Sequence, residues 1–99
     1  MTKTAIDALK AANYANTIAQ AFEANGLDMD GWADLWRKLS DLQFDYLIMS
    51  PAIEPTERID AALIAKCLAI IQQSVNIVSA VIDAAMAESA AHTRAMLNI

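Results

Sequence analysis

The chain has 99 residues, 57% of them hydrophobic, and a formal net charge of −5. This length fits one domain with a modest core, because short chains bury a smaller share of their unfolded surface than long ones. Residues 1–99 are therefore predicted to form a single domain. The 21 alanines favour helix while burying little area, so helices with thin packing faces are expected.

The fold class predicted from the pattern is all-α. Strong turn signals occur at only two places, Gly26 to Gly31 and Pro51 to Pro55, and no run of residues alternates apolar with polar side chains as a strand would. Three helices follow, at about residues 4–25, 30–50 and 55–91 or beyond. The last is long, and we expect it to form the core of a homodimeric helical bundle.

Acidic residues are concentrated in the middle of the chain. The segment from Glu23 to Asp60 contains nine acids and three bases, and the rest of the chain carries +1. No basic stripe is available to neutralise phosphates, so no nucleic-acid partner is expected. An alternative is that this acidic segment imitates nucleic acid, although its three basic residues partly offset the negative charge.

The first expected helix, residues 4–25, has well-marked ends. Thr4 and Asp7 have the spacing of a capping box, and Asn25 followed by Gly26 is a typical C-terminal stop. Between these ends, Tyr14, Ile18 and Phe22 recur at every fourth position, so a narrow packing face lined by alanine is predicted.

The second expected helix, residues 30–50, is amphipathic. Asp28 or Asp30 is the predicted N-cap, and Pro51 disfavours helical geometry in the residue before it. One face gathers large apolar side chains and the opposite face gathers charges. The apolar face consists of Trp32, Leu35, Trp36, Leu39, Leu42, Tyr46 and Leu47.

Two apolar residues of this helix fall on its polar side. Phe44 and Ile48 lie near Arg37 and Asp41 on a helical projection. They need another surface to cover them, or a distorted helix end. The four residues Phe44, Ile48, Asp41 and Asp45 are therefore the candidate contacts for a protein partner.

The third expected helix starts near Pro55 and contains sixteen uncharged residues, Cys67 to Ile82. Its apolar arc covers about half the circumference, and its length, about 55 Å, exceeds a compact domain of this size. Without proline or glycine after Pro55 no kink is expected, so a second copy should cover the arc. The predicted self-association residues are Ile64, Ile71, Val75, Val78 and Ile82.

An alternative for this helix is insertion into a membrane, as in small holin-like proteins, through residues 67–82. The uncharged run is shorter than the roughly 20 residues that span a bilayer, and it contains three side-chain amides. In a soluble helix pair, those amides could instead fix the register. We expect no membrane partner.

Sites of chemistry are not predicted. Asp28, Asp30 and Asp34 surround Gly31 as in a calcium loop, but Arg37 occupies the position that requires a bidentate glutamate. Glu88 and His92 have metal-ligand spacing without further ligands nearby, and Cys67 is expected to be a core residue. We therefore expect no catalytic, metal or cofactor-binding residues and no enzymatic activity.

A single cysteine excludes an internal disulfide, and charges near the N-terminus interrupt any signal-peptide core, so a cytoplasmic location is expected. The function predicted is that of a small acidic helical interaction protein. It would act as an inhibitor, adaptor or assembly factor on another protein, as accessory proteins of bacteria and phages do. Its partners would be another copy of itself and an unidentified protein target.

Overall fold

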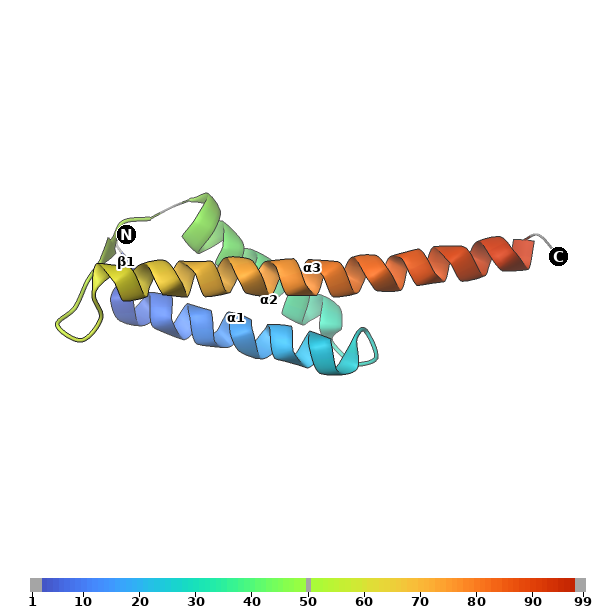
Figure 1. Cartoon of the computed structure of the whole chain (residues 1–99), viewed down its shortest axis with the longest axis horizontal. Coiled ribbons are helices and arrows are strands. Elements are labelled where there is room, and N and C mark those ends of the chain that lie inside the picture. The colour runs from blue at the N-terminus through green and yellow to red at the C-terminus, as the bar shows by residue number, and fades with distance from the viewer. Residues whose placement is uncertain (1–2, 50, 98–99) are drawn as a thin grey trace.

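Three α-helices make up most of the computed structural model, which describes residues 3–49 and 51–97. They are α1 (Ala5–Asn25), α2 (Trp32–Gln43) and α3 (Ala61–Leu97), and a π-helix, η1 (Phe44–Ile48), follows α2 directly. The prediction of an all-α chain whose third helix is long is therefore confirmed. As Figure 1 shows, α3 runs without a kink to the end of the described chain.

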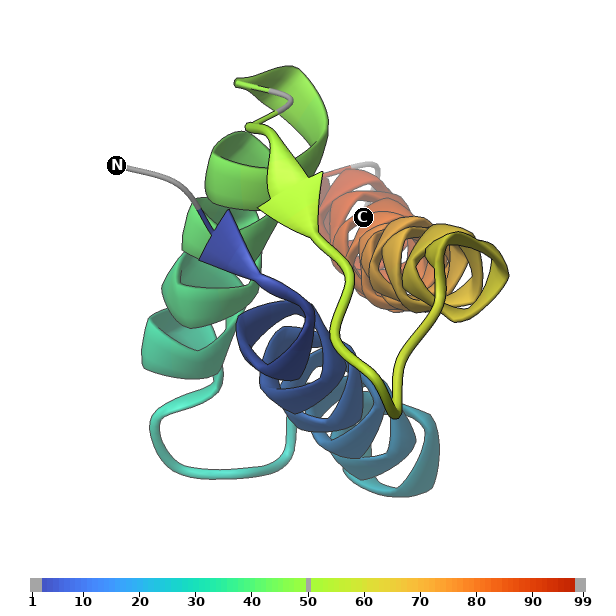
Figure 2. The same ribbon diagram turned by 90° about the vertical axis from the view of Figure 1, so that its left-hand side faces the viewer.

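The helices form a small bundle with one long projection. α1 and α3 lie side by side and run in the same direction, while α2 runs in the opposite direction along one side of this pair, so that the three form a triangle in the end-on view of Figure 2. The molecule measures 64 × 24 × 21 Å, and its radius of gyration is 16.8 Å. A compact domain of this length has a radius near 13 Å, and the excess comes from α3.

The ends of α1 are those that the sequence predicts. Thr4 and Asp7 form a complete capping box, and the helix ends at Asn25 because Gly26 adopts a positive φ of 58°. The buried face contains Ile18 and Phe22 together with a stripe of alanines. Tyr14, expected on this face, is exposed instead. The buried alanines are Ala5, Ala8, Ala11, Ala12, Ala15 and Ala19.

The start of α2 differs from the prediction. Its N-cap is Gly31, in a left-handed conformation with φ 77°, and no side chain caps the helix. Neither Asp28 nor Asp30 fills this role. The α-helix ends at Gln43 and η1 extends the helical segment to Ile48, while Ser50, the predicted last residue, lies outside the described residues.

The start of α3 is also later than predicted. The helix begins at Ala61, not near Pro55, because Thr56 and Ile59 close a turn through two backbone hydrogen bonds, Thr56 N to Ile59 O and the reverse. Ile59 is buried against Ala5. Asp60 then accepts a hydrogen bond from the Leu63 N–H at 2.8 Å, so it caps the first turn.

A short parallel strand pair, unexpected from the sequence, connects the segment before α1 with the segment between η1 and α3. β1 (Lys3–Thr4) pairs with β2 (Ile53–Glu54), and Lys3 is in register with Ile53. The Lys3 N–H also donates to the Ala52 carbonyl at 3.2 Å. Two residues in each strand are too few for a sequence signal, and the pairing depends on α1 and α2 bringing them together.

Candidate functional site

The outer patch is an exposed apolar surface at the C-terminal end of α2. Phe44, Ile48 and Met49 are 51%, 63% and 63% exposed, and the exposed carboxylates Asp41 and Asp45 flank them. Large apolar side chains that remain in water next to each other are unusual on a small protein, and they are typical of a contact surface. The structure thus brings together all four predicted partner contacts and adds Met49.

The patch is carried by a distorted helical turn. The Met49 N–H donates to the Phe44 carbonyl, five residues back, at 2.9 Å, which is the hydrogen bond of a π-helix. The sequence left two possibilities for Phe44 and Ile48, a distorted helix end or another covering surface. The distortion exists, yet both side chains remain exposed, so it does not replace a covering surface. Single π-turns are frequent at functional sites.

Tyr46 anchors this turn to the body of the protein. It is the buried residue of η1, and the Lys3 ammonium lies 5.2 Å from the centre of its ring. Burial raises the pKa of the Tyr46 phenol, and the nearby carboxylates of Asp7 and Asp45 raise it further. The phenol therefore stays neutral, and the buried Tyr46 side chain packs η1, which carries the outer patch, against the main core.

The predicted self-association residues lie mostly in the core of the single chain. Ile71 and Val78 are fully buried, Ile64 and Val75 nearly so, and Ile82 is half-buried. α1 and α2 already cover them, because a triangle of helices encloses two sides of α3. A single chain therefore already packs most of these side chains, and their part in self-association stays a prediction.

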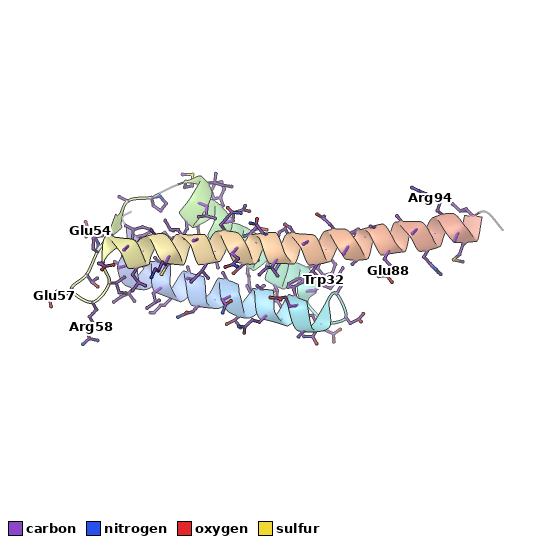
Figure 3. All side chains as sticks on the ribbon, in the orientation of Figure 1. Trp32, Glu54, Glu57, Arg58, Glu88 and Arg94 are labelled. Atoms are coloured by element: carbon purple, nitrogen blue, oxygen red, sulfur yellow. The ribbon has the colours of Figure 1, made fainter. Side chains whose placement is uncertain are left out.

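The helix α3 extends well beyond the part that α1 covers. Val81, Ile82 and Ala85 are the last half-buried residues, and the segment from Met86 to Leu97 is exposed throughout. We call residues 86–97 the overhang. In Figure 3, Glu88 and Arg94 project from it on opposite sides.

A cleft of about 420 Å³ opens where α1 ends beside α3. Its apolar wall includes Phe22, Leu27, Val81 and Ala85, and Glu23, Asp28 and Glu88 place carboxylates at its rim. The sequence analysis did not predict this cleft, because it exists only where the end of one helix meets the middle of another. No group of three or more metal-binding side chains occurs among the described residues.

The remaining residues singled out from the sequence have structural surroundings. Cys67 is buried, and burial raises the pKa of its thiol, which disfavours the reactive thiolate. Trp32 and Trp36 are half-buried against the main core, as predicted. Gln72 and Asn76 are exposed and hydrogen-bond to each other at 2.9 Å along the helix, so neither amide faces α1 or α2.

The class of protein that these features define is an all-α bundle with an exposed apolar patch on one helix end and an uncovered helical overhang. Comparison with known proteins adds no relative: no family model, no curated protein and no solved structure matches the chain significantly.

Proposed function

We propose that this protein is a small acidic interaction protein that binds another protein through the outer patch and acts as a homodimer, as an inhibitor, adaptor or assembly factor. The observation that carries the proposal is the exposure of Phe44, Ile48 and Met49 beside two carboxylates. Apolar anchors with a charged rim are the usual anatomy of a protein interface.

The same surface indicates the chemistry of the target. Asp41 and Asp45 belong to a segment with nine acids and three bases, so an apolar surface rimmed by lysine or arginine would be complementary. Such complementarity accelerates association and is weakened by salt. The proposal therefore includes a basic target and an association rate that falls as ionic strength rises.

The experiment is affinity purification from the native host with the full chain as bait, followed by binding of the identified, purified target. The double variant Phe44→Asp/Ile48→Asp should abolish binding, because a charge without a partner in an apolar contact is costly. Tyr14→Asp is the matched control, since Tyr14 is a similarly exposed aromatic residue on α1. Equal binding by both variants would exclude the outer patch.

A second candidate, insertion into a membrane, rests on α3. The helix Ala61–Leu97 is long and apolar enough to cross a membrane by length and composition. In the bundle, however, its apolar face packs against α1 and α2, and insertion would have to separate them. Fractionation of expressing cells distinguishes the candidates: an integral membrane protein stays in the membrane pellet after a carbonate wash.

A further inference from the structure

Buried and half-buried side chains of α3 include a series with the spacing of a coiled coil. It alternates in steps of four and three residues through Ile64, Leu68, Ile71, Val75, Val78 and Ile82, with the buried Cys67 and Ser74 beside it. This spacing keeps one face of a long helix against its neighbours. The next steps of the same series reach Ala85, Ser89, His92 and Met96, which extend it through the overhang.

The cover of this face stops abruptly. α1 ends at Asn25, beside Val81 and Ala85, as the lining of the cleft shows. Past that level the overhang continues alone for twelve residues, about 18 Å. These residues continue a helix that is already formed, so they pay no nucleation cost, but they gain no tertiary packing, and a neighbour on this face would stabilise them.

We propose that the overhang of a second copy occupies this face, with the two α3 helices antiparallel and the two-fold axis midway between Ala90 and Ala91. The proposal rests on the self-association included in the proposed function and specifies its interface. The partner's overhang would extend the line of α1, and each overhang would cover the other, as the two-fold symmetry of a homodimer requires.

The residues along the series match one another in this register. The axis brings Ser89 to the level of His92 of the second copy, where hydroxyl and imidazole can form a hydrogen bond. It brings Ala85 to the level of Met96, a small residue against a large one. Met96 of the second copy would then reach the cleft beside Phe22 and Leu27, and the flexible thioether suits an irregular apolar space.

A parallel pair does not fit the same face. The overhang presents the side of α3 along which α1 lies, so a parallel second α3 would run back into the volume of α1. An antiparallel helix enters from the free end and stops where α1 ends. Arg94 lies off the series, so pairing does not bury its charge between the helices, whereas Glu88 stays at the rim of the cleft that Met96 of the second copy would reach.

Sedimentation of the full chain tests the interface. The wild-type protein should form dimers, and Met96→Asp or Ser89→Lys should weaken dimerisation on the order of 100-fold, because each buries an unpaired charge. Both residues are exposed in the single chain, so the variants should fold. Ala91→Lys is the matched control, because Ala91 lies about 200° around the helix from Ser89 and should leave the dimer intact.

Cysteine cross-linking tests the direction and register. A mixture of Ser89→Cys and size-tagged His92→Cys proteins should form the mixed disulfide, whereas either protein alone should cross-link poorly. Preferential cross-linking of Ser89→Cys with itself would indicate a parallel pair and overturn the proposal. A monomeric wild-type protein, or a dimer that tolerates Met96→Asp, would also overturn it, while target binding through the outer patch is measured independently.

Discussion

Thr4 and Asp7 exchange two hydrogen bonds across the first turn of α1. The Thr4 N–H donates to Asp7 Oδ2 at 3.0 Å, and the Asp7 N–H donates to Thr4 Oγ1 at 3.1 Å. These bonds satisfy two backbone donors that the start of a helix otherwise leaves to water. They also fix the chain direction where β1 enters α1, next to the support of the outer patch.

Removal of the cap should destabilise the protein measurably. Thr4→Ala is expected to lower the free energy of unfolding by about 1 kcal/mol, a typical value for an N-cap hydroxyl. Thr4→Ser should retain most of the stability, because it keeps the hydroxyl. Urea unfolding followed by circular dichroism gives both values, and equal loss in the two variants would contradict a capping role.

The capping box also predicts a dependence on pH. Hydrogen bonds from the Thr4 backbone and side chain lower the pKa of Asp7 below its ordinary value of 3.8. The carboxylate thus stabilises the folded state fully above that value, and the contribution is lost as the pH falls through the lower folded-state pKa. Melting temperatures between neutral and acidic pH should fall more for wild type than for Asp7→Asn.

Larger side chains in the alanine stripe of α1 should destabilise the protein. Ala15 is fully buried between α1 and its neighbours, so Ala15→Leu must displace packed atoms, and overpacking typically costs about 1–3 kcal/mol. Ala24→Leu is the matched control, since Ala24 is exposed on the same helix. Thermal melts should show a lower melting temperature for Ala15→Leu alone, and two similar melts would refute close packing along this stripe.

Substitution of two adjacent isoleucines of α3 should lower the stability of the protein by very different amounts. Ile71 is fully buried and Ile70 is 38% exposed. Ile71→Ala is expected to cost about 2–5 kcal/mol through lost contacts and a cavity. Ile70→Ala should cost clearly less, because part of that side chain is already in water. Chemical denaturation of the two variants measures the contrast, and equal costs would mean that α3 packs through a different face.

Substitution by asparagine should affect stability differently at Gly31 and at Gly26. Gly31 lies in the left-handed region at φ 77° and ψ 16°, which asparagine tolerates, so Gly31→Asn should be nearly neutral and Gly31→Ala destabilising by about 1–2 kcal/mol. Gly26 has φ 58° and ψ −132°, outside that region, so Gly26→Asn should destabilise as Gly26→Ala does. Unfolding curves of the four variants test this pattern.

Helix existence could be predicted from the sequence because its signals are local. The capping box, the Asn25-Gly26 stop and the apolar face of α2 each involve residues within a few turns of one another. The predicted start of α3 was wrong. Pro55 suits the first turn of a helix and therefore predicts a start there, whereas the side chain of Asp60 caps the first turn of α3. Asp60 is a typical N-cap type, and a comparison of the two signals could have favoured it.

The candidate surface was predictable in part. Phe44 and Ile48 stand out on a helical projection, so the patch could be found without coordinates, but the π-turn and the exposure of Met49 could not. The self-association residues were assigned to a second copy because the sequence shows how wide an apolar arc is, not which neighbour covers it. In the fold, α1 and α2 cover Ile71 and Val78 themselves.

The sequence by itself determined three helices, their amphipathic faces and the unbroken length of the third, because backbone propensity and side-chain spacing act within a single segment. Only the tertiary structure decided that α1 runs alongside α3, that Lys3 pairs with Ile53, and that residues 86–97 extend without cover. These features depend on contacts between distant segments, and such contacts are set by how the helices fit together in space.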